Sequence, residues 1–208
     1  MFTRRHLMGV AAGGAAALAL PLKIARAAAA ELGDDGLYHQ DWFVQSFLEL
    51  EADLTEAAEA GKHFAVMWEQ AGCPFCRKTH EINLARPDIA DYLKENFAIV
   101  QLNLFGAREV TDFDGETDEE RAIARRWAVN FTPTIQFFPN DPAEVAGKDG
   151  RTAELARIQG YLPPFYFYHF FEWIRSGAQA ETGFQRYSND KVKEYADKGV
   201  TPQDWVLK

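Results

Sequence analysis

The chain has 208 residues, 25% of them charged and 13% aromatic, and its formal net charge is −9. This length allows one domain with a substantial core, or one domain with added segments. Beyond the N-terminal region no stretch has about twenty uninterrupted apolar residues, so no membrane span is expected there. The acidic balance argues against binding to nucleic acid or to anionic lipid.

Residues 1–27 are expected to be an export signal that is not part of the fold. Arg4 and Arg5 precede a weakly apolar run rich in Gly and Ala, and small residues around Ala27 fit a cleavage site. The pattern resembles a twin-arginine signal, and an ordinary Sec signal that holds two arginines is the alternative. Either signal indicates export, most simply to a bacterial periplasm. Cleavage near Ala27 removes four of the 22 basic residues and none of the 31 acidic ones, which changes the net charge from −9 to −13.

The rest of the chain predicts alternating helices and strands. Apolar residues at three- and four-residue spacing predict a helix over 41–60, which Gly61 would end. The further expected elements are a strand at 63–69, helices at 74–84 and 88–96, a strand at 97–104, a helix from 117 to about 128, strands at 135–138 and 155–160, and a helix at 165–176. The last two strands are expected to pair antiparallel. This order is typical of an α/β fold in which helices cover both faces of a mixed sheet.

Two segments carry weaker signals. Residues 105–116 form an acidic stretch in which Asp112 and Asp114 faintly resemble a calcium loop, but Gly115 comes too early for that spacing, so a solvated loop is expected. A capping-box pattern at 117–120 would start the helix that follows.

The aromatic helix at 165–176 is expected to cover one face of the sheet. Tyr161, His169 or Trp173 at its rim could help to bind a partner. The tail at 179–208 has low hydrophobicity and a weak helical pattern at 190–198, and we assign it no role from its sequence.

Cys73 and Cys76 are the only two cysteines, and they are separated by Pro74 and Phe75. They lie between a predicted strand and a predicted helix. At a helix N-terminus the free backbone N–H groups and the dipole stabilise a thiolate, so Cys73 is the expected nucleophile and Cys76 can close a disulfide with it. Pro74 suits the first helical position. In an oxidising compartment this disulfide is expected to be a working part of the protein.

Two other interpretations of the cysteine pair are less favoured. A zinc site needs about four ligands, and His80 is the only further candidate nearby. A structural disulfide usually closes a longer loop.

The motif at 73–76, together with Thr132-Pro133-Thr134 at the start of a predicted strand, resembles the thioredoxin superfamily. The resemblance covers roughly residues 61–176. Within the superfamily the chain looks most like the exported SoxW-type thioredoxins associated with bacterial sulfur oxidation, because of the lead-in at 69–72, the long N-terminal helix and the Gly-Tyr-Leu step at 160–162. This resemblance divides the rest of the chain into an N-terminal extension with a helix at 28–60, a thioredoxin-fold domain at 61–178 and a tail at 179–208.

The resemblance implies a role for each matching residue. Cys73 would be the exposed nucleophile and Cys76 the buried resolving thiol. The peptide bond between Thr132 and Pro133 would be cis. Before a proline, the cis form costs only about 0.5–1 kcal/mol relative to the trans form. The alternative is an ordinary trans proline at the edge of a strand. The residues expected to contact the substrate are Thr132, Pro74 and Phe75.

The sequence departs from the thioredoxin pattern at two positions. Gly72 stands where thioredoxins usually have Trp, and Met67 stands where they bury an acid. Glu69 is the only nearby carboxylate that could accept the proton of Cys76, and burial would suit it to proton transfer near neutral pH. The alternative is a solvent-facing Glu69.

The expected direction of electron flow follows from Phe75, one of the two residues between the cysteines. Phe75 offers no charge or hydrogen bond to the thiolate, which predicts a moderately reducing couple within the family range of about −270 to −120 mV, and thus a reductase. Such a reductase needs electrons from a membrane thiol carrier of the DsbD/CcdA kind and no cofactor beyond its two sulfurs. A sulfur-carrier protein or apocytochrome c are the possible acceptors, and a monomer is expected. The alternatives are a thiol oxidase, a disulfide isomerase, or a non-catalytic binding or chaperone module.

Overall fold

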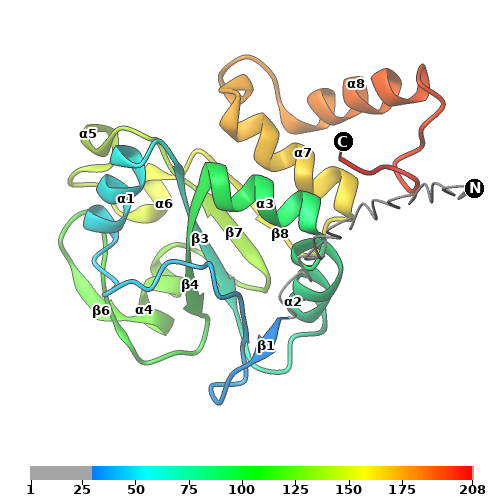
Figure 1. Ribbon diagram of the computed structural model, residues 1–208. Coiled ribbons are helices and arrows are strands. Elements are labelled where there is room, and N and C mark those ends of the chain that lie inside the picture. Colours follow the sequence, from blue (N-terminus) through cyan, green and yellow to red (C-terminus); the bar gives the residue numbers. More distant parts are fainter. Residues whose placement is uncertain (1–29, 208) are drawn as a thin grey trace, which may run out of the picture.

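The computed structural model describes residues 30–207, so the expected export signal at 1–27 lies outside the described residues. A four-stranded sheet forms the centre of the molecule, with the strand order β4-β3-β7-β8 (Figure 1). Its strands are β3 (His63–Glu69), β4 (Phe97–Asn103), β7 (Thr134–Phe137) and β8 (Ala156–Gln159). β3 runs parallel to β4 and antiparallel to β7, and β7 pairs antiparallel with β8. The sheet is therefore mixed, as predicted.

Helices cover both faces of the sheet (Figure 1). They are α1 (Leu50–Glu59), α2 (Pro74–Lys78), the π-helix η1 (Thr79–Leu84), α3 (Pro87–Asn96), α4 (Glu120–Arg126), α5 (Pro142–Val145), α6 (Gly150–Ala153), α7 (Pro164–Arg175), the 3-10 helix η2 (Ala178–Ala180) and α8 (Phe184–Ala196). Two short hairpins complete the fold, β1 (Glu31–Leu32) with β2 (Tyr38–His39), and β5 (Glu109–Thr111) with β6 (Thr117–Glu119). No helix within residues 30–207 combines the length and the apolar character needed to cross a membrane.

Alternation along β3 separates the two hydrophobic cores. Phe64, Val66 and Trp68 face the core that contains α1 and α4. Ala65 and Met67 face the other core, which α3 and α7 close. Successive side chains of a strand point to opposite faces, so one buried strand serves both cores. The prediction that the aromatic helix α7 covers one face of the sheet is confirmed.

The predicted helix over 41–60 is wrong in its first half, because α1 begins only at Leu50. Residues 42–49 instead pass along the edge of the sheet, where the backbone N–H of Val44 donates to the carbonyl of Ile99. Phe43 enters the core under α7, Leu50 enters the core under α1, and Phe47 is 97% exposed. Apolar residues of one helix would share a face, whereas these three point in different directions. A left-handed Leu48 (φ 64°) separates the two halves.

The predicted capping box is also wrong, because residues 117–119 form β6, and α4 begins at Glu120 without a side-chain cap. The acidic stretch before it is not a simple solvated loop. Asp112 is buried and accepts hydrogen bonds from Trp127 Nε1 at 2.7 Å and from the backbone N–H of Gly150 at 3.0 Å. This carboxylate holds the loop to the core.

The C-terminal tail is part of the packed structure. It forms α8, which is longer than the predicted helix, and it buries Trp205 against Phe165 and Tyr168 of α7. His169 and Trp173 lie under this tail and are buried, so the expectation that they reach a partner at the rim of α7 is wrong.

Candidate active site

The two cysteines lie where β3 ends and α2 begins. Gly72 has φ 72°, a left-handed conformation that glycine adopts without steric cost, and it turns the chain into the helix. Cys73 is the N-cap of α2, and its Sγ accepts a hydrogen bond from the backbone N–H of Cys76 at 3.0 Å. Pro74 occupies the first turn, as predicted. The two cysteines form a disulfide with a Cα–Cα distance of 5.3 Å.

The start of β7 lies beside this disulfide. The peptide bond between Thr132 and Pro133 is cis. Cys73 Sγ lies 3.5 Å from the carbonyl oxygen of Thr132, and the Thr132 hydroxyl donates to the same sulfur at 3.3 Å. The structure thus brings together the two motifs that carry the sequence resemblance.

Cys73 is more buried than the resemblance implies. It is 5% exposed, compared with 2% for Cys76, so the expectation of an exposed nucleophile is wrong. The reason is that the hairpin β1–β2 lies next to the motif and places Leu32 and Tyr38 beside Cys73. Cys73 still lines a pocket of about 390 Å³ between this hairpin and α2.

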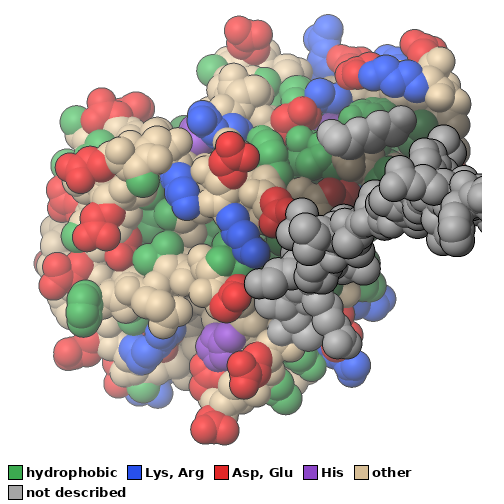
Figure 2. Space-filling view, in the orientation of Figure 1, with side chains coloured by type: hydrophobic (Ala, Val, Ile, Leu, Met, Phe, Trp, Pro, Cys, Tyr) green, Lys and Arg blue, Asp and Glu red, His purple; other side chains and the backbone are tan. Residues whose placement is uncertain are grey.

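Two aromatic side chains near the motif are open to solvent. Phe75, between the cysteines, and Phe131, just before the cis peptide bond, are each 49% exposed. On the face of the molecule shown in Figure 2, acidic side chains are prominent around α1. A partner would therefore meet exposed aromatic rings next to the sulfurs, on a protein with a strongly acidic surface.

Glu69 is fully buried at the end of β3, so the solvent-facing alternative is wrong. It shares a face of the strand with Met67, the position at which thioredoxins bury their acid. Its carboxylate accepts from His80 Nε2 at 2.9 Å and from the side-chain amide of Gln101 on β4. Since all three side chains are buried, this polar cluster lies inside the molecule below the cysteine helix.

His80 is a site residue that the sequence analysis considered only as a third metal ligand. It lies on the π-helix η1, which continues α2 without a break, and π-helical turns are frequent at functional sites. Cys76 and His80 are four residues apart on this continuous helix, and both are buried, so they share its inner side. That spacing was the available sequence signal for His80. The second ring nitrogen, Nδ1, lies 3.1 Å from Nε2 of Gln40.

Within residues 30–207 there is no group of three or more His, Cys, Asp or Glu side chains placed to hold a metal ion.

The Thioredoxin-like domain family matches residues 50–174, which is more than half of the chain. The protein therefore belongs to this family, and the mixed sheet with helices on both faces is a thioredoxin-like fold, as predicted. The match does not include the N-terminal segment that holds Leu32, Tyr38 and Gln40.

Similar solved structures share the fold at low identity. A thioredoxin-fold protein from Helicobacter pylori is 22% identical, with a TM-score of 0.46, covering 66% of this chain and 84% of that chain. A thioredoxin from Thermus thermophilus is 21% identical, with a TM-score of 0.46, covering 61% and 83%. The C-terminal domain of DsbD from Neisseria meningitidis, in its oxidised form, is 14% identical, with a TM-score of 0.40, covering 59% and 90%. No curated protein matches the chain. Likenesses this distant carry no argument about function.

Proposed function

We propose that this protein is a periplasmic thiol:disulfide oxidoreductase that reduces disulfides of partner proteins through a dithiol/disulfide cycle of Cys73 and Cys76. The observation that carries the proposal is the position of this disulfide, at a helix N-terminus and 3.5 Å from the carbonyl of a cis-proline peptide. The helix end stabilises a thiolate on Cys73. The backbone of Thr132 lies beside the sulfur, where an extended partner segment can pair with it.

The cycle consists of two thiol–disulfide exchanges. The Cys73 thiolate attacks the partner disulfide, so a Cys73–partner bond forms and the partner S–S bond breaks, and the first partner sulfur leaves and is protonated by water. The thiol of Cys76 then gives its proton to Glu69 and attacks Cys73. The Cys73–Cys76 bond forms, the mixed disulfide breaks, and the second partner sulfur leaves. Two electrons pass from the protein to the partner, and Glu69 returns its proton to solvent.

Glu69 is proposed as the base because of its surroundings. It contacts His80, which lies one helical turn after Cys76 on the same buried side. A positioned base contributes about 10²–10⁴-fold to the rate of a proton transfer. Pro74 and Phe75 follow the buried Cys73 and are exposed, and we propose that they contact the partner chain together with Thr132.

The physiological direction is proposed to be reduction. Phe75 provides neither charge nor hydrogen bond to the thiolate, so Cys73 depends mainly on the helix end. The chain would then act as a SoxW-type thioredoxin that is exported by its twin-arginine-type signal and recharged by a membrane thiol carrier of the DsbD/CcdA kind. Its acceptor would be a sulfur-carrier protein or apocytochrome c. The reaction needs no group other than the two sulfurs.

The proposal is tested by insulin reduction with dithiothreitol as electron donor, using Cys73→Ser as the control. We expect activity in the wild type and none in the variant. The equilibrium potential against glutathione is expected to lie closer to about −270 mV than to about −120 mV. A value near −120 mV would identify an oxidase instead, and equal absence of activity in both proteins would favour a binding module. A Cys76→Ser variant, which cannot resolve the mixed disulfide, would trap the partners.

A further inference from the structure

A chain of side-chain hydrogen bonds runs from the N-terminal segment to Glu69. It begins at Trp42, whose indole Nε1 lies 3.2 Å from Oε1 of Gln40. An indole N–H can only donate, so this contact identifies the accepting oxygen of the Gln40 amide. The amide nitrogen of Gln40 therefore faces Nδ1 of His80, at 3.1 Å, and donates to it.

This donation fixes the tautomer of His80. Because Nδ1 accepts a hydrogen bond, the ring proton lies on Nε2. Nε2–H in turn donates to the two carboxylate oxygens of Glu69, at 2.9 and 3.1 Å. All donors in the chain point in one direction, from the indole of Trp42 to the carboxylate.

Glu69 receives a second donor from the other side. The amide nitrogen of Gln101 donates to its Oε2 and also to the carbonyl oxygen of Tyr38, at 2.7 Å. The carbonyl can only accept, so it identifies the nitrogen of this amide as well. A carboxyl group that meets N–H donors from both His80 and Gln101 has its hydrogen-bonding needs met as an ionised acceptor in the oxidised protein.

We propose that Gln40 is a positioning residue of the redox site, which holds His80 in its neutral Nε2–H form and thereby keeps Glu69 as a carboxylate that is ready to take the proton of Cys76. The effect of Gln40 on catalysis rests on the proposed function, whereas the tautomer of His80 follows from the hydrogen bonds alone. Gln40 lies in the segment before residue 50, outside the family match. The N-terminal segment thus completes the site chemically as well as covering Cys73.

The groups around the pair of Glu69 and His80 come from α2, β4 and the N-terminal segment. Cys76 belongs to α2, and Gln101 belongs to β4. From the N-terminal segment, the ring of Tyr38 lies 5.8 Å from that of His80, and the ring of Phe43 lies 6.0 Å from it. Tyr38 is thus a further titratable group beside the pair, and Cys76, four residues before His80 on the same helix, becomes titratable once the disulfide is reduced. On the β4 side the charged Arg108 donates to the backbone carbonyl of Gln101, at 3.0 Å.

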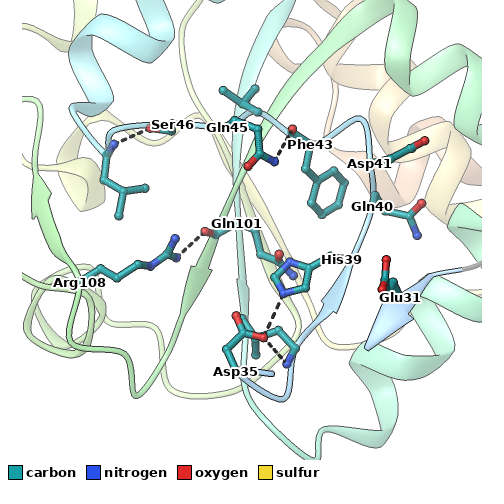
Figure 3. Close-up of a pocket in the computed structure, with 13 residues that line it drawn as sticks. Glu31, Asp35, His39, Gln40, Asp41, Phe43, Gln45, Ser46, Gln101 and Arg108 are labelled. Carbon is teal, nitrogen blue, oxygen red and sulfur yellow. Dashed lines mark hydrogen bonds and ion pairs between the residues drawn. The ribbon is translucent and has the colours of Figure 1, made fainter. Parts of the chain in front are cut away.

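The structure also supplies a matched control. Gln40 and Gln45 both line a pocket of about 520 Å³ between the N-terminal segment and β4 (Figure 3). The amide of Gln45 donates to the backbone carbonyl of Phe43, and no hydrogen bond joins it to Glu69 or His80. Identical substitutions at the two positions therefore change the same pocket wall, at a buried position for Gln40 and at an exposed one for Gln45, and only the one at Gln40 removes the donor to His80.

The first experiment reads the protonation of His80 directly. In ¹⁵N NMR spectra of the oxidised protein at pH 7, we expect Nε2 of His80 to be protonated and Nδ1 to be unprotonated, in the wild type and in Gln45→Glu. In Gln40→Glu the new carboxylate can only accept, so Nδ1 should become protonated. An unprotonated Nδ1 in Gln40→Glu, or a protonated Nδ1 in the wild type, would overturn the inference whether or not the protein has redox activity.

The second experiment measures the consequence for catalysis. Protonation of Nδ1 leaves Glu69 either paired with an imidazolium or itself protonated, and both states make it a weaker base. Insulin reduction by Gln40→Glu at pH 7 should therefore fall by about tenfold, part of the 10²–10⁴-fold contribution of a positioned base, and its pH–rate profile should change shape. Gln45→Glu should follow the wild-type profile.

Trp42→Phe provides a second variant, because it keeps the aromatic contact with Phe43 but removes the donor that orients the Gln40 amide. We expect a mixture of His80 tautomers and an intermediate rate. If both Trp42→Phe and Gln40→Glu reduce insulin with the wild-type pH profile, the positioning role is wrong while the proposed function stands. If the wild type is inactive, the proposed function fails, and the NMR experiment alone decides the state of His80.

Discussion

The segments on either side of the family match, residues 30–49 and 175–207, serve the same fold in different ways. The N-terminal segment brings polar groups to the cysteine site, where Gln40 contacts His80 and the carbonyl of Tyr38 accepts from Gln101. The C-terminal segment brings aromatic surface to α7, where Trp205 is buried. The N-terminal segment contacts groups of the redox site, whereas the C-terminal segment packs on the hydrophobic core away from that site.

This difference leads to a simple expectation. Changes in the C-terminal segment should alter the free energy of unfolding and leave thiol exchange unchanged. Changes around the polar cluster should alter the rate or its pH dependence with a smaller effect on stability. The following substitutions test this separation, from the largest expected effect to the smallest.

Trp205→Ala should lower the free energy of unfolding by about 3–5 kcal/mol, because it removes a buried aromatic side chain and leaves a cavity against Phe165 and Tyr168. Urea denaturation measures the loss. The neighbouring Val206→Ala, at an exposed position, should change stability by less than about 0.5 kcal/mol. A slower insulin reduction by folded Trp205→Ala protein would contradict the proposed separation of roles.

Glu69→Gln should slow release of the mixed disulfide by about 10²-fold, because the amide cannot accept the proton of Cys76. The substitution keeps the size of the side chain and an oxygen that can accept from His80, so the fold should be retained. Stopped-flow measurement of the second exchange step gives the rate. Glu81→Gln, an exposed partner of Arg77, is the control. An unchanged pH profile in Glu69→Gln would remove its role as a base.

His169 should make the stability pH-dependent in mildly acidic solution. Burial lowers the pKa of His169 below its usual 6.5, and the hydrogen bond to the carbonyl of Phe165 only partly opposes this. The unfolded chain therefore binds a proton below pH 6.5 before the folded chain does. Stability should fall with decreasing pH from that point, by at most about 1.4 kcal/mol per unit from this group. His169→Gln should flatten this slope, as urea denaturation between pH 7 and pH 5 would show.

The smallest effect on stability is expected for Asp88, whose contribution changes at a lower pH than that of His169. Burial acts to raise its pKa, but the hydrogen bonds from Arg86 and from the backbone N–H of Leu207 outweigh this and lower the pKa below 3.8. A carboxylate with a lowered pKa stabilises the fold above that value, and the contribution disappears as the pH falls below it. Asp88→Asn should cost about 1 kcal/mol at pH 7 and less at pH 2. An equal loss at both pH values would show that charge is not involved.

The sequence predicted those parts of the fold that depend on local patterns. The strands β3 and β4 have long, mainly apolar runs, β7 and β8 alternate polar and apolar residues, and the aromatic helix α7 begins at a proline pair. The two motifs of the site were found because each is contiguous in the chain. The disulfide and the cis peptide bond lie where the resemblance implied.

Contacts between distant residues were not predictable in this way. Gln40 and His80 are 40 positions apart, and Glu69 and Gln101 are 32 positions apart, so no spacing rule joins them. The burial of Cys73 depends on a hairpin of four paired residues, too short to give a strand pattern. The segment before α1 has apolar residues at helical spacing by chance, and its side chains pack into two different hydrophobic cores.

The strand order β4-β3-β7-β8 leaves two sheet edges, and they are treated differently. The N-terminal segment runs along β4, so β8 is the edge to which a neighbouring molecule could add a strand. Arg157 interrupts the apolar character of β8 and is held in place by its ion pair with Glu154. A charge on an edge strand disfavours strand addition, so an apolar substitution of Arg157 is expected to make assembly through β8 easier.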